Sequence, residues 1–314
     1  MKKLLIFSLL FFSWFQNIGA QQNLVGSYHI SSGNPDDGGY NWFLFDNNEF
    51  AMVTFGQIIS GKWTQNENHK IIFKPYIPDQ SLQVFGRYNP DINGSKILFK
   101  DLDINEKTFI ATSTKEMQNI LNEDANCLPY PVKKEFDHSL EKLMLSNCLT
   151  QNLKQNRLGF DYEIADNNDF VIIYYNSQMM LPEFKGEIVN SQLTLNQGSS
   201  SSPKRSISKT DESEIKKFVE QQKNYYSQTS FLSTKENRFG TISPEGIINF
   251  EENQLRLSHY IIDSKTGIYV LKSALDEMVP AEFKTLYFYK KLNFKKSTEP
   301  IKFFKKSLFQ FQCN

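Results

Sequence analysis

Residues 39–55 read GYNWFLFDNNEFAMVTF, with apolar and polar side chains alternating on both sides of Asp46-Asn47-Asn48. A period of two is typical of strands in an antiparallel sheet, and the three polar residues tolerate the left-handed backbone of a tight turn. The stretch therefore predicts two strands joined by a turn. Both faces of the strand from Tyr40 to Phe45 are partly apolar, so we expect a neighbouring layer to cover it.

A second stretch, residues 159–175, reads GFDYEIADNNDFVIIYY and aligns with the first without a gap. The offset is 159 − 39 = 120 residues, and it also places 24–30 over 144–150, which predicts a strand there. We interpret the match as an internal repeat; the alternative is a chance match between two hairpins with similar turns. Five residues are identical, since Gly39, Asp46, Asn47, Asn48 and Phe50 recur as Gly159, Asp166, Asn167, Asn168 and Phe170.

Short alternating runs separated by Asn, Asp and Gly continue along the chain, and amphipathic helical stretches are scarce. Asn93-Gly94 is a strong hairpin signal, and further turns are expected at Pro244-Glu245-Gly246 and Lys265-Thr266-Gly267. The pattern predicts an all-β fold of two related antiparallel modules, each a barrel or a sandwich. In the first half we expect strands near 24–30, 40–45, 49–55, 58–64, 69–74, 82–87, 95–100 and 107–112.

One helix is expected over 211–226, where Ile215, Phe218 and Val219 share a face and Asp211 is the expected N-cap. The Ser-rich run before it predicts an exposed loop over 199–209. Removing an N-terminal signal leaves 314 − 20 = 294 residues, enough for two modules. The expected boundaries are a signal over 1–20, module 1 over 21–118, a connector over 119–139, and module 2 over 140–314 with the helix inserted in it.

The N-terminus has the pattern of a bacterial export signal. Lys2 and Lys3 precede an apolar run from Leu4 to Phe15, and Ile18-Gly19-Ala20 suits cleavage after Ala20. The apolar run is shorter than the roughly 20 residues that a membrane-spanning helix needs. We therefore expect a periplasmic or secreted protein without a transmembrane anchor.

The strand order and Gly26-Ser27-Tyr28 resemble the up-and-down barrel of lipocalin-like proteins, in which a Gly-x-Trp lies on the first strand. Tyr28 stands where that family has Trp, and the resemblance covers the first module alone. It implies an apolar ligand inside a barrel. A two-sheet sandwich fits the same pattern of strands.

Export makes a disulfide plausible for the three cysteines, Cys127, Cys148 and Cys313. Pairing of Cys127 with Cys148 would tie the connector to the second module. Pairing of Cys148 with Cys313 would join its first and last strands, and other pairings stay open. No base is spaced to activate any of these thiols, so we predict no nucleophilic cysteine.

No motif predicts a catalytic residue, a metal site or a cofactor. His29, His69, His138 and His259 are scattered, without the spacing of a zinc site. The acidic turns lack the spacing of a calcium loop, and turn chemistry explains them. Asp46, Glu49, Asp101 and Glu251 are candidates for a pair of glycosidase carboxylates, but only geometry could select two of them.

The whole chain carries 35 basic and 35 acidic side chains, which gives no reason to expect a nucleic-acid partner. Its C-terminal part is nevertheless rich in lysine and aromatic residues. This region would suit an anionic surface; the plainer interpretation is that lysines occupy the solvated face of edge strands. The lysines in question are Lys290, Lys291, Lys295, Lys296, Lys305 and Lys306.

Together these patterns favour an exported, non-enzymatic binding or envelope-associated β protein. Its partner would be an apolar small molecule, a glycan or an envelope component. A secreted carbohydrate-active hydrolase and a structural or adhesion protein are the alternatives. Two carboxylates facing each other in a cleft would favour the hydrolase, whereas a closed apolar interior would favour binding.

Overall fold

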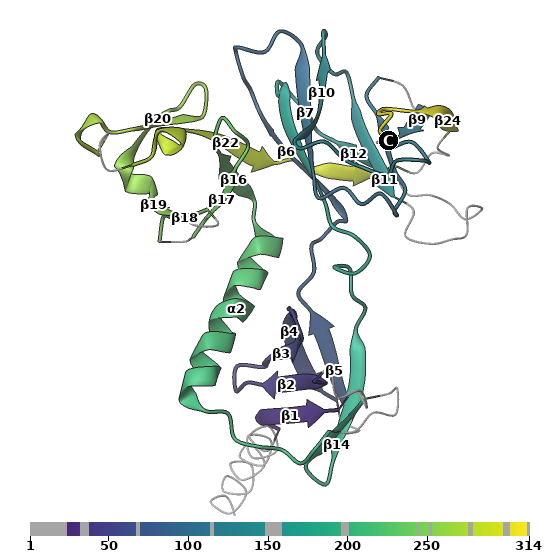
Figure 1. Ribbon diagram of the computed structural model, residues 1–314, viewed down its shortest axis with the longest axis vertical. Helices are drawn as coiled ribbons and strands as arrows, with labels where there is room; N and C mark the ends of the chain where they lie inside the picture. The colour runs from purple at the N-terminus through teal and green to yellow at the C-terminus, as the bar shows by residue number, and fades with distance from the viewer. Residues whose placement is uncertain are drawn as a thin grey trace, which may run out of the picture. The chain divides into compact units, whose positions relative to one another are not determined.

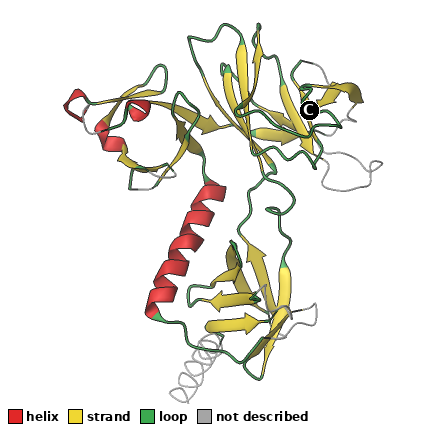
Figure 2. Cartoon of the chain, in the orientation of Figure 1, coloured by secondary structure: helices red, strands yellow, loops and turns green. Residues whose placement is uncertain are grey.

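The computed structural model describes residues 24–31, 38–66, 70–113, 116–147, 159–195, 201–243, 245–250, 253–275, 279–297 and 302–312. The predicted export signal, 1–20, lies outside these residues. Within them the fold is all-β, as predicted, with mostly antiparallel sheets and a single α-helix (Figure 2).

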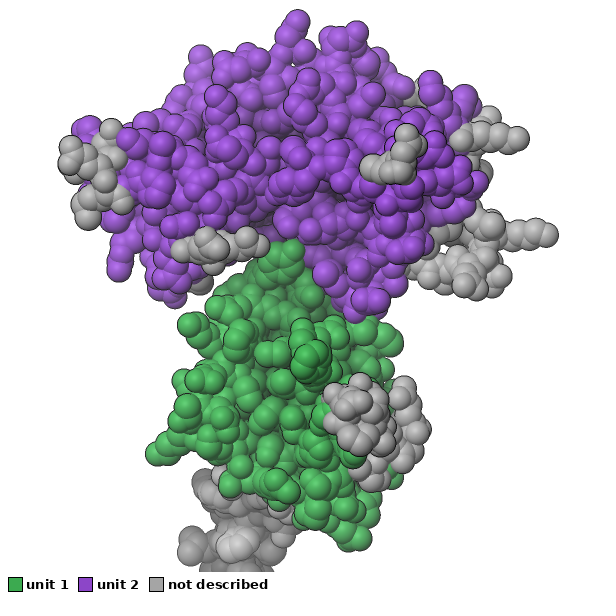
Figure 3. Space-filling view, viewed as in Figure 1, with its two compact units in different colours: residues 1–77, 181–226 green, residues 78–180, 227–314 purple. Residues whose placement is uncertain are grey.

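The described residues divide into two compact units, coloured separately in Figure 3. Each unit is made of two separate pieces of the chain, unlike the continuous modules expected over 21–118 and 140–314. The difference arises because strands pair here over long sequence separations, which a local side-chain pattern does not encode. Unit 1 comprises 1–77 and 181–226, and unit 2 comprises 78–180 and 227–314.

Unit 1 is built on one seven-stranded antiparallel sheet (Figure 1). Its strands, in spatial order, are β1 (Gly26–Ile30), β2 (Tyr40–Leu44), β3 (Glu49–Thr54), β4 (Gln57–Gln65), β5 (Lys70–Pro75), β14 (Phe184–Val189) and β15 (Gln192–Leu195). Asn48, with a φ of 61°, makes the predicted turn between β2 and β3. The hairpin of β14 and β15 joins the sheet beside β5, although about a hundred residues separate them in sequence.

The segment 201–205 closes this sheet into a barrel by running between its two edge strands. The backbone N–H of Ser201 donates to a carbonyl of β15 at 2.8 Å, and that of Ser202 donates to a carbonyl of β1 at 2.7 Å. The predicted exposed loop over 199–209 holds in part for this segment: it forms no strand and Pro203 and Arg205 are exposed, but Ser201 is buried. Ser201 is buried because the segment lies between the two edge strands of the barrel, β15 and β1.

Aromatic and aliphatic side chains fill the barrel interior. The ring of Trp42 lies 4.7 Å from that of Phe73 and 5.7 Å from that of Phe50, centre to centre. Gly61 allows β4 to approach β5, since a Cβ there would lie 2.1 Å from the carbonyl oxygen of Lys74. The other buried members of this cluster are Leu24, Tyr28, Ile30, Leu44, Ile59, Trp63, Ile71 and Leu193.

One helix, α2 (Lys209–Ser227), packs on the outside of the barrel, close to its predicted bounds. It belongs to unit 1 rather than to a second module. Its N-cap is Ser208 and not Asp211, since the N–H of Asp211 donates to Ser208 Oγ at 3.1 Å. Val219 is fully buried and contacts Phe45, whose side chain points outward from the barrel.

Unit 2 contains two sheets. The larger sheet has, in spatial order, β10 (Val132–Phe136), β7 (Ser95–Lys100), β13 (Asp169–Tyr174), β6 (Leu82–Arg87), β22 (Thr285–Lys291), β16 (Ser230–Ser233), β17 (Phe239–Ile242), β18 (Ile247–Asn249) and β19 (Gln254–Arg256), while β20 (Tyr260–Asp263) pairs with β21 (Ile268–Leu271), which pairs with β22. The smaller sheet has β23 (Phe294–Lys296), β12 (Phe160–Tyr162), β11 (Leu143–Asn147), β8 (Thr108–Ala111), β9 (Glu116–Asn119) and β24 (Lys302–Ser307). Short 3-10 turns cover Leu257–His259, Ser273–Leu275 and Ala281–Phe283.

The two sheets of unit 2 pack face to face. Phe170 and Tyr174 of the larger sheet belong to the same buried cluster as Leu145 and Tyr162 of the smaller one. A second buried cluster, around Phe283, contains residues from the part of the chain that runs from β16 to β22 in sequence. The strand pattern left open whether each module is a barrel or a sandwich. Unit 1 is a barrel and unit 2 is a sandwich.

All eight strands expected in the first half are present, within about two residues at each end. The hairpin expected at Asn93-Gly94 is wrong, because β13 inserts between β6 and β7 and pairs with both. The predicted connector, 119–139, contains β10, which pairs with β7 in the larger sheet.

The topology does not support the internal repeat. Residues 39–55 form the hairpin of β2 and β3, whereas 159–175 contribute β12 and β13 to different sheets. The turns differ as well, because the positive φ falls at Asn48 in the first stretch and at Ala165 in the second. The shared residues therefore reflect common strand and turn preferences rather than a duplicated module.

Candidate functional site

A groove on the outside of unit 1 is the candidate binding site. It lies between α2 and the turn that joins β3 to β4, and its volume is about 660 Å³. Small-molecule sites in proteins occupy roughly 300–1,000 Å³. The lining residues are Val53, Thr54, Gly56, Gln57, Ile58, Phe218, Gln221, Gln222, Tyr225 and Tyr226.

Gln222 joins the helical wall of the groove to the sheet wall. Its Oε1 accepts hydrogen bonds from the Ser60 backbone N–H at 2.9 Å and from the Ser60 hydroxyl at 2.5 Å. Its Nε2 donates to the carbonyl oxygen of Ile58 at 3.2 Å. Ser60 is fully buried, so this amide satisfies polar groups that water does not reach. The spacing of the two walls is fixed by these bonds and by buried Val219.

The rest of the lining combines apolar rings with uncharged polar groups. Phe218 is 52% exposed. The side-chain amides of Gln57 and Gln221 have no protein partner among the described residues and are exposed to solvent. A ligand with apolar and hydrogen-bonding groups could cover the ring and exchange these amides' bonds to water for bonds to itself.

Two tyrosines form the C-terminal part of the helical wall. The rings of Tyr225 and Tyr226 lie 5.5 Å apart, centre to centre, and are tilted by 59°. Burial raises the pKa of the Tyr226 hydroxyl, and a hydrogen bond with the Gln222 side chain opposes part of this rise, so the neutral hydroxyl already has a partner in the helical wall.

The charged residues around α2 are paired with one another and do not line the groove. Lys216 lies 2.7 Å from Glu212 and 3.3 Å from Asp46, and Lys223 lies 3.8 Å from Glu49. Asp46 and Glu49, two of the carboxylates considered for glycosidic chemistry, are therefore ion-pair partners outside the groove.

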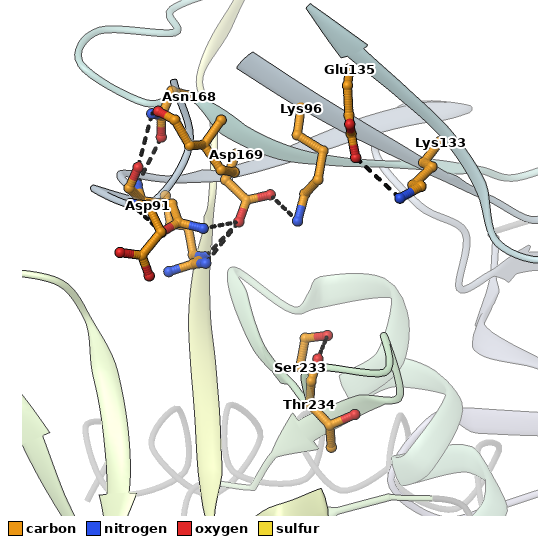
Figure 4. Close-up of polar contacts among 11 residues, drawn as sticks. Asp91, Lys96, Lys133, Glu135, Asn168, Asp169, Ser233 and Thr234 are labelled. Carbon is orange, nitrogen blue, oxygen red and sulfur yellow. Dashed lines mark hydrogen bonds and ion pairs between the residues drawn. The ribbon is translucent and has the colours of Figure 1, made fainter. Parts of the chain in front are cut away.

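A buried charge cluster lies in the larger sheet of unit 2 (Figure 4). Asp169 of β13 is fully buried, and its neighbours in register are Arg87 of β6 and Lys96 of β7. Its Oδ2 lies 2.8 Å from Arg87 Nη2, and its Oδ1 lies 3.0 Å from Lys96 Nζ. Asn89 donates a longer hydrogen bond, of 3.4 Å, to the same carboxylate.

Two tyrosines of β22 cover the guanidinium of this cluster. The Arg87 guanidinium carbon lies 4.4 Å from the ring centre of Tyr287 and 5.4 Å from that of Tyr289. Burial, reinforced by the charge of Asp169, raises the pKa of Tyr289. Because Arg87 is only 6% exposed, the cluster has little surface to offer a ligand, and we assign it to the stability of unit 2.

The structure divides the predicted lysine patch between different sheets and edges. Lys290 and Lys291 lie on β22, Lys295 and Lys296 on β23, and Lys305 and Lys306 on β24. β23 and β24 are the opposite edges of the smaller sheet. Two of these lysines are in ion pairs, with 2.8 Å between Lys291 and Asp79 and 2.9 Å between Lys295 and Glu163. Binding of an anionic surface by this set stays a prediction.

Among the cysteines, Cys127 lies within the described residues and is disulfide-bonded. Cys148 and Cys313 lie outside them. A bonded Cys127 is compatible with its predicted pairing to Cys148. It is not compatible with pairing of Cys148 to Cys313, because the chain has three cysteines.

The histidines that lie in the described residues show no metal arrangement. His29 Nδ1 lies 2.9 Å from Asn41 Oδ1, and His138 Nδ1 lies 2.7 Å from Asp137 Oδ1. In the described part of the chain, no three His, Cys, Asp or Glu side chains are grouped to hold a metal ion. Nor does any helix there have the length and hydropathy to cross a membrane.

Comparisons with known proteins add no information: no protein family, no curated protein and no solved structure matches this chain.

The sequence pattern alone did not identify the groove. It placed Phe218 on the apolar face of the helix and placed Phe55 at the end of a strand, but nothing local indicates that these segments meet. An exposed aromatic residue at the tip of a turn, such as Phe55, is common on protein surfaces and gives no signal of a site.

Proposed function

We propose that this protein is an exported, non-enzymatic binding protein and that the groove of unit 1 holds its ligand. The observation that carries the proposal is a groove with fixed walls and an exposed aromatic ring in its lining. Gln222 and Val219 fix the helix on the barrel, while Phe218 stays exposed in the groove. A preformed site of this kind loses little conformational entropy when it binds.

The groove is a better place for a ligand than the inside of the barrel. The resemblance to lipocalin-like proteins predicts an apolar ligand in the interior. Trp42, Trp63, Phe50 and Phe73 occupy that interior as a packed cluster. A ligand there would have to displace these rings from one another, whereas the groove already opens to solvent.

Binding without chemistry is supported by the composition of the groove. A glycosidase needs two carboxyl groups, about 5–10 Å apart, around the bond that it cleaves. None of the residues that line the groove is Asp or Glu. A tyrosine or glutamine without a neighbouring base does not replace that pair.

Export rests on the N-terminal sequence, and its test is independent of the groove. We expect the protein recovered from the producing cell to begin at Gln21 and to occur outside the cytoplasm. Cell fractionation measures the location, and intact mass and N-terminal sequencing of the recovered protein measure its first residue. A chain that retains Met1 and is found in the cytoplasmic fraction would contradict export. It would not affect the proposal that the groove binds a ligand.

The binding proposal is tested by fluorine NMR of protein labelled with 3-fluorotyrosine. Tyr225→Phe and Tyr226→Phe identify the two groove resonances, and Tyr130, which is 85% exposed and lies in unit 2, is the internal reference. Octanoate, phenol and cellohexaose serve as apolar, aromatic and carbohydrate probes. We expect saturable shifts at Tyr225 and Tyr226, and none at Tyr130, with at least one probe. Groove resonances that respond to none of the three would overturn the proposal.

A further inference from the structure

We infer that the ligand of the groove is a neutral oligosaccharide, an inference that rests on the proposed binding function. The lining offers two kinds of group at once, apolar rings and planar amides. A pyranose ring presents the same two kinds, since its C–H groups form apolar faces and its hydroxyl groups project around the edge. An aliphatic ligand would leave the amides unpaired, which is costly inside a covered site.

The rings of the helical wall are placed to pack against a flat ligand face. Phe218 keeps 52% of its surface exposed within the lining. The rings of Tyr225 and Tyr226 line the same wall. A sugar unit that covered Phe218 would remove this apolar area from water.

The amides are placed to bind the hydroxyl groups. Gln57 comes from the turn and Gln221 from α2, so donors and acceptors stand on both walls. Gln222 is different, because its Oε1 and Nε2 already bond to Ser60 and Ile58. It acts as a positioning residue, and we expect Gln57 and Gln221 to make the hydrogen bonds to ligand.

The electrostatics exclude a charged glycan. No lysine, arginine, histidine, aspartate or glutamate lines the groove. Of the cations on α2, Lys216 and Lys223 are paired with carboxylates, and none of them, Lys217 included, lines the groove. An anionic sugar would lose its hydration in the groove without gaining a counter-charge, so a neutral chain is the better fit.

The experiment is isothermal titration of mature protein with cellohexaose, mannohexaose, xylohexaose and anionic hexagalacturonate. We expect at least one neutral hexasaccharide to bind and hexagalacturonate not to bind. Phe218→Ala should weaken binding about tenfold, as loss of a stacked ring does. Gln221→Ala should weaken it about fivefold. Phe304→Ala is the matched control, because that ring is 55% exposed but lies in unit 2.

Each other outcome overturns the inference in a recognisable way. If octanoate or phenol shifts the groove tyrosines and no neutral hexasaccharide binds, the ligand class is wrong while the binding function stands. If a hexasaccharide binds equally well to Phe218→Ala, the sugar site is elsewhere. Equal or tighter binding of hexagalacturonate would contradict the electrostatic argument. If no probe shifts the fluorine resonances of Tyr225 and Tyr226, both the binding function and the sugar ligand are wrong.

Discussion

Replacing Asp169 by Asn should destabilise unit 2 more than any other single removal of charge. The substitution keeps the shape of the side chain and removes the only carboxylate within reach of Arg87 and Lys96 among the described residues. Arg87 is 6% exposed and Lys96 is 24% exposed, so neither cation regains full hydration where it lies. The new amide would also present donors to a guanidinium and an ammonium that are themselves donors.

The magnitude follows from the geometry. At 2.8 and 3.0 Å, with an effective dielectric constant of about 20, each attraction is roughly 5–6 kcal/mol before desolvation is subtracted. Most of that energy offsets the cost of burying the charges. Removing Asp169 leaves the cost of burying Arg87 and Lys96 uncompensated. The free energy of unfolding should therefore fall by about 3–5 kcal/mol. At roughly 2–4 °C per kcal/mol, the melting temperature should fall by about 6–20 °C.

The assay is urea unfolding at pH 7, followed by circular dichroism, on wild type and Asp169→Asn. Glu163→Gln is the control, because its pair with Lys295 is exposed to solvent on both sides and should contribute little to stability. A loss below about 1 kcal/mol for Asp169→Asn would refute the argument that the cluster supports unit 2 as a buried network. A loss equal to that of Glu163→Gln would do the same.

Three further predictions concern the barrel, the tyrosines and the cysteines. Gly61→Ala should cost about 1–3 kcal/mol in urea unfolding, because its Cβ would meet a backbone carbonyl at 2.1 Å; an unchanged midpoint would contradict the close approach of β4 and β5. Burial raises the pKa of Tyr260 to about 12, so its neutral form stabilises the fold fully below pH 10, and this contribution declines as the pH rises to about 12. Tyr260→Phe should therefore lose less stability than wild type between pH 10 and 12, and identical pH profiles would exclude the effect. Intact mass with and without reductant should show one disulfide that includes Cys127, and three free thiols would contradict it.

The strands were largely predictable because alternation is a local property. All eight strands of the first half, the helix, and the turns at Gly246 and Gly267 follow from neighbouring side chains. Partners in the sheets were not predictable in the same way. β13 looked like the second arm of a hairpin, yet it pairs with β6 and β7, both distant in sequence.

The Ser-rich segment shows why composition misled us about exposure. Serine runs are typical of loops, and the prediction of an exposed loop followed from that tendency. The structure buries Ser201, and backbone bonds of 201–205 satisfy both edges of the barrel, while Pro203 and Arg205 stay exposed. Whether a polar segment is buried depends on the unpaired edges available to it, which the segment itself does not specify.

The groove was not predictable for a related reason. Phe218 and Phe55 are separated by more than 160 residues, and each alone has an ordinary explanation, as part of a helix face or a strand end. Only the packing of α2 on the barrel brings Phe218 beside the turn that carries Phe55 and forms the groove. The wrong N-cap has the same origin on a smaller scale, since Asp211 and Ser208 both suit the position by residue type.

A crystal structure of the mature protein with its tightest-binding neutral hexasaccharide locates the sugar directly. We expect an intact sugar chain between α2 and the turn of β3 and β4, with a ring against Phe218 and hydroxyl groups near Gln57 and Gln221. Density for the sugar inside the barrel, on the lysine-bearing strands of unit 2, or as a cleaved product would contradict it.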